Sequence, residues 1–172
     1  MVSYWKRSEE GCDIRIFETT DYVGQLRQLC RDGHTVSCKI IGGSMVPFFA
    51  DGRDSVILCA PDRPLRCGDI VFYQRDNGAF ILHRIMRICP DGTYDMAGDS
   101  QSEIECGIRP EQIFAIAKEA VRRGKHITPR TLVWRFFAVI WCRPMLIPHR
   151  RWIIAVWSRL KKTRTRGCRK FT

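Results

Sequence analysis

The sequence has no apolar run of the length that crosses a bilayer. Its two most apolar stretches, residues 132–142 and 152–160, are separated by Pro144 and Pro148, and neither reaches the ~20 residues of a transmembrane helix. Residues 1–12 carry Lys, Arg and Glu without the apolar core of a secretory signal. We therefore expect no signal peptide and no clear transmembrane span, in a protein that is cytoplasmic or peripheral to the cytoplasmic face of a membrane.

Disulfide and metal-ligand patterns are missing as well. Cysteine is frequent, with nine residues, but the number is odd and no Cys-x-x-Cys pair occurs. No histidine has a metal-ligand partner at a recognisable spacing, so we expect neither a zinc site nor a cofactor. Several cysteines lie in apolar segments and are interpreted as reduced packing residues, namely Cys38, Cys59, Cys89 and Cys142.

Acidic residues are absent after Glu119. Residues 1–119 carry 14 Lys and Arg against 18 Asp and Glu, a balance of −4, whereas residues 120–172 carry 15 basic and no acidic residues. So sharp a change marks a boundary between a globular unit and a basic appendage. We expect an N-terminal segment with one helix (1–35), a β domain (36–121) and a basic, aromatic-rich helical tail (122–172).

Local patterns predict a mainly β chain. Thr20-Asp21 and Gly33 are typical start and stop signals of a helix between them, which is too short and too isolated for a helix-turn-helix domain. Asp76-Asn77-Gly78 is a strong hairpin signal. Many short strands with turn signals favour a small antiparallel β unit, with strands expected over residues 36–41, 55–60, 70–74, 80–89, 93–97 and 113–121.

A serine and a histidine stand out within this unit. Ser44 lies in the run Gly-Gly-Ser-Met-Val-Pro (42–47), and His83 lies in the apolar run Ile-Leu-His-Arg-Ile (81–85). The two glycines allow a tight backbone that exposes Ser44 and aims N–H groups at an oxyanion. A serine hydroxyl needs a nearby base, and histidine suits that role, with activity falling below about pH 6 to 7. The alternative is an ordinary glycine turn.

These motifs occur in the order found in a known superfamily. Residues 66–73 (RCGDIVFY) lie between the Ser44 run and the His83 run, and residues 96–105 (MAGDSQSEIE) follow the His83 run. Over residues 36–118 this order resembles that of the signal peptidase I and LexA-like serine peptidases. In this respect the chain is similar to the eukaryotic and archaeal signal peptidase branch, which has a histidine at the position of the base. The resemblance implies the coiled β fold of that group and a membrane-associated serine endopeptidase acting on a peptide or precursor protein.

The resemblance also implies roles for individual residues. Ser44 would be the nucleophile, His83 the base, and Met45 an apolar wall for the substrate. The Gly-Asp motif is kept as Gly98-Asp99, but Ser100-Gln101 replaces the two Asn usual in this branch. Either Asp99 or Glu105 would orient the imidazole, and Asp99 is slightly preferred. Alternatively, Asp99 caps its own turn.

Other functions stay open at this point. A self-cleaving LexA-like regulator and a non-catalytic peptide-binding or membrane-docking module fit the same fold. Thr128-Pro129 is a good helix start, and basic residues flanking Trp and Phe suit an anchor to an anionic membrane surface through residues 128–162. The alternative is a helical pair packed on its own β domain or on a partner. Nucleic-acid binding is not favoured, because no recognition helix or stacking platform accompanies the basic stretch.

Overall fold

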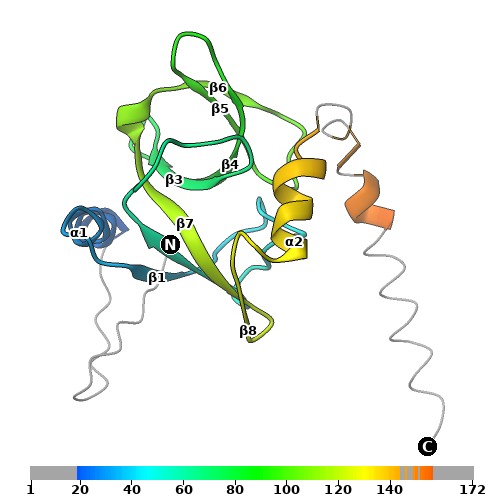
Figure 1. The fold of residues 1–172 in the computed structure, drawn as a ribbon, viewed down its shortest axis with the longest axis horizontal. Helices are drawn as coiled ribbons and strands as arrows, with labels where there is room; N and C mark the ends of the chain where they lie inside the picture. Colours follow the sequence, from blue (N-terminus) through cyan, green and yellow to red (C-terminus); the bar gives the residue numbers. More distant parts are fainter. Residues whose placement is uncertain (1–18, 144–145, 147–148, 151, 157–172) are drawn as a thin grey trace, which may run out of the picture.

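The computed structural model describes residues 19–143, 146, 149–150 and 152–156 (Figure 1). This part of the chain is mainly β, with an open eight-stranded antiparallel sheet and a few short helices. The elements are α1 Thr19–Arg31, β1 Val36–Lys39, β2 Ser55–Cys59, β3 Ile70–Gln74, β4 Phe80–Ile88, β5 Tyr94–Ala97, β6 Glu105–Ile108, the 3-10 turn η1 Pro110–Gln112, β7 Ile113–Arg122, β8 Lys125–Ile127, α2 Leu132–Arg135 and the π-helical turn η2 Phe136–Ile140.

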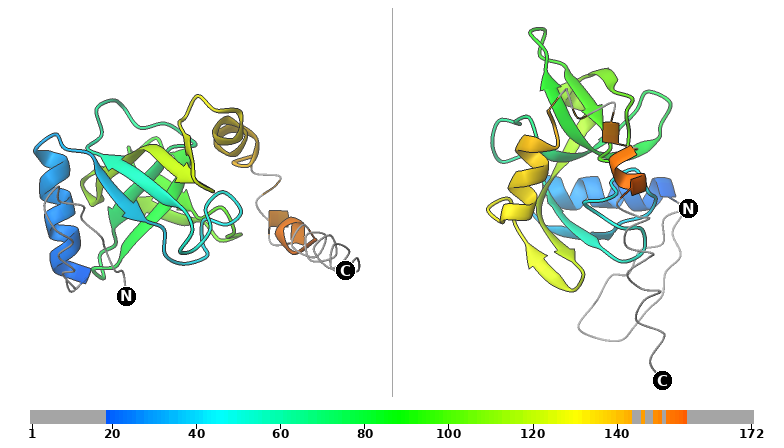
Figure 2. Two further views of the ribbon diagram at one scale, coloured as in Figure 1. Left: turned by 90° about the horizontal axis from the view of Figure 1, so that it is seen from below. Right: turned by 90° about the vertical axis from the view of Figure 1, so that its right-hand side faces the viewer.

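Strand β7 is an inner strand of the sheet, paired with β2, β3 and β8. The strand order is β1-β2-β7-β3-β4-β5-β6, and β8 also pairs with β7. Strands β3 to β6 follow one another as a meander. Strand β7 then returns to lie between β2 and β3 and pairs with both. Figures 1 and 2 place α1 and α2 on opposite sides of this sheet. The loop after β1 and the loop after β5 lie between them in sequence and carry the motif residues.

Helix α1 covers one part of the core. Val23, Leu26 and Cys30 are buried, as expected for apolar residues spaced three and four apart on one helical face. The helix ends where Gly33 adopts a φ of +84°, a left-handed conformation that glycine adopts without steric cost. The helix expected between Thr20-Asp21 and Gly33 is therefore confirmed.

The six expected strands are all present within a few residues of their expected bounds. Strands β6 and β8 were not expected. Both are short and mostly polar, and each buries only its last residue, Ile108 or Ile127. An alternating pattern needs several buried positions to be visible in a sequence, so neither strand is distinguishable from a loop. Strand β8 also lies beyond the boundary expected after residue 121.

The first half of the tail packs against the β unit. Trp134, Phe137 and Trp141 are buried in the same core cluster as Phe48. The Phe48 ring lies 5.3 Å from Trp134 and 5.1 Å from Phe137, between ring centroids. Pairs at this separation contribute about 0.5–1.5 kcal/mol beyond their buried area. This half of the tail therefore completes the core next to the loop that follows β1.

The opposite face of the same segment is apolar and exposed. Leu132 has 84% of its surface exposed, and further along the tail Trp152 has 71% exposed. None of the helices in the described ranges is long and apolar enough to cross a bilayer. The segment is thus apolar on two faces, and the β unit covers one of them. We call the exposed face of α2 and η2 the outer face; it consists of Leu132, Phe136, Val139 and Ile140.

We predict that Trp134 is essential to stability, although it lies in the tail. Trp134→Ala should lower the free energy of unfolding by about 3–5 kcal/mol, because it removes a buried ring and leaves a cavity. Leu132→Ala, two residues earlier on the exposed face, should change it by no more than about 0.5 kcal/mol. Urea unfolding measures both. Equal, small effects would mean that the tail does not belong to the core.

Candidate active site

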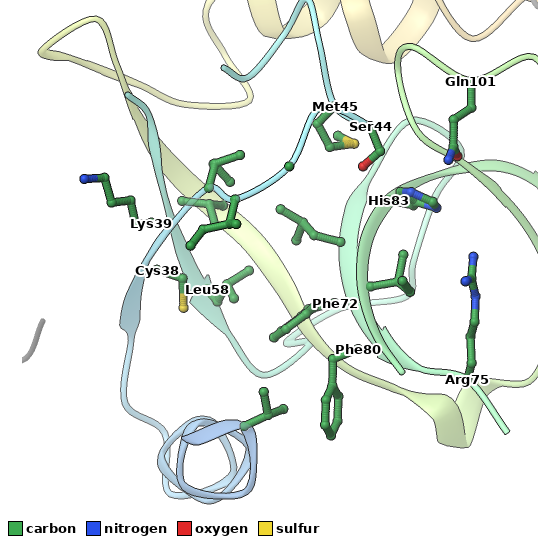
Figure 3. Close-up of a pocket in the computed structure, with 17 residues that line it drawn as sticks. Cys38, Lys39, Ser44, Met45, Leu58, Phe72, Arg75, Phe80, His83 and Gln101 are labelled. Carbon is green, nitrogen blue, oxygen red and sulfur yellow. The ribbon is translucent and has the colours of Figure 1, made fainter. Parts of the chain in front are cut away.

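One apolar pocket of about 320 Å³ contains the sequence-predicted serine and histidine. Figure 3 shows Ser44, His83 and Gln101 at one end, with Leu58, Phe72 and Phe80 further along toward α1. Most of the lining is aliphatic or aromatic, and a few polar side chains interrupt it. Pockets that bind ligands commonly combine apolar walls with a few convergent polar groups. The geometry therefore places Ser44 and His83 in one candidate site.

The backbone around Ser44 forms a constrained turn. Gly42 has a φ of +92°, a region that favours glycine, and its N–H donates to the Asp51 carboxylate at 2.9 Å. The N–H of Phe49 donates to the Met45 carbonyl at 2.8 Å, and the buried Phe49 ring holds the end of the turn in the core. Met45 is itself buried and lines the pocket, where sequence reasoning expected an apolar wall.

A second loop holds the nucleophile candidate from the other side. The Ser44 carbonyl accepts hydrogen bonds from the Ser100 N–H at 2.8 Å and from the Ser100 hydroxyl at 2.9 Å. A Cβ on Gly98 would lie 2.5 Å from the Ser44 carbonyl oxygen, so only glycine allows this approach. Sequence reasoning treated Ser100 merely as a departure from a motif. The structure gives it a contact that positions the Ser44 backbone.

His83 comes from β4 and is almost completely buried, with 3% of its surface exposed. Burial lowers the pKa of His83 to about 4, and the positive charge of Arg75 acts in the same direction against the opposing charges of Glu105 and Asp99. The imidazole is therefore neutral near pH 7, the form that can accept a proton. The hydrogen bond found for His83 within the described ranges goes to Tyr73, not to Ser44. In the absence of substrate, the hydrogen bond between a catalytic serine and its base is often longer or less well aligned than an ordinary hydrogen bond.

A chain of three residues reaches the Nδ1 side of His83. Arg75 donates two hydrogen bonds to the Glu105 carboxylate, at 2.7 and 2.6 Å. The Tyr73 hydroxyl donates to the same carboxylate at 2.8 Å and lies 3.4 Å from His83 Nδ1. Because the carboxylate accepts the hydroxyl hydrogen, the Tyr73 oxygen is left to accept from Nδ1–H. This arrangement favours the tautomer whose Nε2 carries the free lone pair.

Sequence reasoning missed Tyr73, although a signal was present. The hairpin turn at Asp76-Asn77-Gly78 sets the register of β3 and β4, in which His83 pairs with Val71 and Tyr73 pairs with Ile81. Tyr73 is therefore diagonal to His83 on the same face of the hairpin, within reach of a long side chain. Glu105 was an alternative orienting acid, and the structure connects it to His83 through Tyr73.

Asp99 has a different partner. Its two carboxylate oxygens accept hydrogen bonds from Arg84 at 2.9 and 2.8 Å, and both side chains are completely buried. Arg84 also donates to the Gly68 carbonyl at 2.8 Å. Asp99 thus acts on His83 only through its charge in this structure, and its direct contact is with the neighbouring arginine. The pair ties the loop after β5 to β4.

Other kinds of site find no support within the described ranges. No group of three or more His, Cys, Asp or Glu side chains lies close enough together there to hold a metal ion. The cysteines of this part of the chain form no disulfide. No protein-family model, curated protein or solved structure matches the chain.

We predict that His83 remains neutral down to about pH 4, because burial opposes the charged form. Nitrogen NMR of the imidazoles should show an Nδ1–H, Nε2-lone-pair tautomer at pH 7 for His83, with His83→Gln used for assignment. An imidazole that titrates near its ordinary pKa of 6.5 would contradict the prediction. Any activity that uses this base should persist well below pH 6, lower than the ordinary pKa suggested from the sequence.

Stability should follow the same titration. Between pH 6.5 and about 4 the unfolded chain binds a proton at His83 that the folded chain does not bind. The free energy of unfolding should therefore fall as the pH falls through this window. Glu105 should lower the free energy of unfolding further at lower pH. Burial raises its pKa, but hydrogen bonds from Arg75 and Tyr73 outweigh burial and lower it.

In Tyr73→Phe the His83 tautomer preference should weaken, and an unchanged preference would exclude Tyr73 from orienting the ring.

Proposed function

We propose that the protein is a serine endopeptidase of the signal peptidase I and LexA-like type, with the coiled β fold of that group, which cleaves a peptide or precursor protein. The observation that carries this proposal is the meeting of Ser44 and a neutral, buried His83 at one end of an apolar pocket. The open, mainly β sheet and the order of the motifs along it support the same conclusion.

In this proposal Ser44 is the nucleophile and His83 is the base. Ser44 Oγ attacks the scissile carbonyl carbon while His83 Nε2 takes the hydroxyl proton. The imidazolium then gives this proton to the leaving amine, the C–N bond breaks, and an acyl-serine remains. Water, deprotonated by the same imidazole, hydrolyses the ester and regenerates Ser44. No cofactor takes part in these steps.

Two groups assist His83 and the oxyanion in this proposal. Tyr73, held by Glu105, keeps Nδ1–H directed at its own hydroxyl oxygen, so Nε2 stays the accepting atom. Within the described ranges no hydrogen bond is assigned to the backbone N–H of Ser44. A free N–H beside the nucleophile is the group that stabilises an oxyanion in acyl transfer. The apolar pocket wall, including Met45, receives a substrate side chain.

A serine-directed fluorophosphonate probe and a peptide library test the proposal together. The wild-type protein should be labelled at Ser44 and should cleave at least one peptide, or itself. Ser44→Ala should abolish labelling and lower kcat/KM by at least about 10³-fold. Ser37→Ala is a matched control, since Ser37 is an exposed serine on β1 outside the pocket lining, and it should behave like the wild type.

The outcomes separate the alternatives. Cleavage that persists in Ser44→Ala would exclude the mechanism. Cleavage of the chain itself, with no peptide turnover, would indicate a self-cleaving LexA-like regulator. Peptide binding in the pocket without labelling or cleavage would indicate a non-catalytic module on the same fold.

We also propose that the enzyme works at an anionic membrane surface, which the outer face contacts. The inner side of the segment is occupied by the core, whereas the outer face exposes four apolar side chains. Exposed Arg130, Arg135 and Arg143 flank it, and residues 120–172 contain no acid that would repel anionic lipid. Apolar burial combined with basic residues, each contributing about 1 kcal/mol near such a surface, suits interfacial binding.

Vesicle sedimentation tests this partner. Vesicles containing phosphatidylserine should bind the protein and neutral phosphatidylcholine vesicles should bind it at least tenfold less. Phe136→Ser with Val139→Ser should weaken binding to anionic vesicles by tenfold or more, because it removes buried apolar area. Ile104→Ser removes an exposed apolar residue elsewhere and should have no effect. Self-association through the outer face, without vesicle binding, would identify a second copy as the occupant instead.

A further inference from the structure

We infer that Gln101 is a further catalytic residue, whose side-chain N–H donates a hydrogen bond to the oxygen of the scissile carbonyl as negative charge develops there. The inference rests on the proposed function and adds to it the second donor of the oxyanion site. Gln101 lines the pocket together with Ser44 and His83. Figure 3 shows its side chain reaching from the loop after β5 toward His83.

The orientation of the carboxamide is determined by its surroundings. The backbone N–H of Gly98 donates to Gln101 Oε1 at 3.0 Å. A backbone N–H can only donate, so the oxygen of the amide must lie on that side and the NH₂ group on the other. Within the described ranges no acceptor is assigned to Gln101 Nε2. The site therefore contains a directed donor group that the folded chain itself does not use.

Gln101 also lies close to the nucleophile. A Cβ built on Gly98 would lie 2.5 Å from the Ser44 carbonyl oxygen, 3.0 Å from the Ser44 Cβ and 3.1 Å from Gln101 Oε1. One small volume next to Gly98 thus contacts both Ser44 and the Gln101 amide. For this role, the carbonyl oxygen of an acyl group on Ser44 Oγ must come within hydrogen-bond reach of the Gln101 NH₂ group.

The loop that carries Gln101 is held in place independently of substrate. The indole N–H of Trp141 donates to the Asp99 carbonyl at 2.9 Å. The buried Arg150 guanidinium donates to the Gly98 carbonyl at 3.3 Å and to the Gln101 carbonyl at 3.4 Å. A donor in a rigid, partly buried position costs little reorganisation during the reaction, and this is the condition for a large electrostatic contribution.

The other polar side chains of the pocket do not offer the same group. Arg75 lines the pocket, but Glu105 accepts two of its hydrogen bonds. Lys39 lines it on β1, away from the Ser44 end in Figure 3. Among the described residues that line the pocket, His83 and Gln101 remain as polar side chains at the Ser44 end, and His83 must accept a proton. Gln101 is therefore the side-chain donor best placed for the oxyanion.

Gln101→Glu is the sharpest test, because it keeps the shape of the side chain. A carboxylate oxygen can still accept from the Gly98 N–H, but nothing donates into the pocket. We expect kcat to fall by about 10²–10³-fold with little change in KM, since the hydrogen bond forms mainly in the transition state. Gln101→Met, which is neutral and lacks a donor, should lose activity to a similar extent. Gln25→Glu on the exposed surface of α1 controls for the added charge.

Binding of a peptide boronate gives a readout besides turnover. Its affinity should fall in Gln101→Met in parallel with kcat/KM, because the boronate adduct on Ser44 carries the oxygen that Gln101 contacts. Full activity in Gln101→Met, or a loss of thermal stability that accounts for the whole effect, would overturn the inference while leaving the peptidase proposal intact. A wild-type protein that neither cleaves nor reacts with the fluorophosphonate would overturn both.

Discussion

The buried pair of Arg84 and Asp99 connects the strand that carries His83 with the two loops that carry Ser44 and Gln101. Two completely buried charges are costly to remove from water, and only close, fully hydrogen-bonded geometry offsets that cost. Asp99 accepts two hydrogen bonds from Arg84, and the Gly68 carbonyl accepts a third. The Arg84 guanidinium also lies 5.0 Å from the centre of the Phe48 ring, in the turn that carries Ser44. One side chain thus joins β4, the loop after β5 and the Ser44 turn.

The same pair explains why Asp99 does not contact His83. Successive residues on a strand point to opposite faces, and His83 and Arg84 are neighbours on β4. His83 faces the pocket and Tyr73, so the residue that binds Arg84 lies across the strand from the imidazole. Glu105 lies on the His83 side, and Tyr73 bridges the gap. Asp99 therefore organises the loop, while Glu105 is the acid connected to the base.

Sequence patterns predicted the parts of this molecule that local rules govern. The glycine turn at Ser44, the hairpin at Asp76-Asn77-Gly78 and the strands that carry His83 follow from spacing and turn chemistry over a few residues. The meeting of Ser44 and His83 in one pocket needed the resemblance in motif order, because they are 39 positions apart in the sequence. The hairpin register already brings Tyr73 next to His83, but its bond to Glu105 joins β3 to β6. Ser100 contacts the Ser44 turn from another loop, and no local pattern encodes such contacts.

The tail shows the limit of composition as a guide. Its aromatic and basic residues suggested a separable appendage, but an apolar residue does not reveal whether its own domain or a partner covers it. In the structure Trp134, Phe137 and Trp141 belong to the core, whereas the four apolar side chains of the outer face are exposed. Trp141 also donates to the loop that holds Gln101. Deleting the tail would therefore remove core packing and a support of the site along with any membrane contact. Substitutions confined to the outer face are needed to separate binding from catalysis, because only they leave the contacts of Trp141 and Arg150 in place.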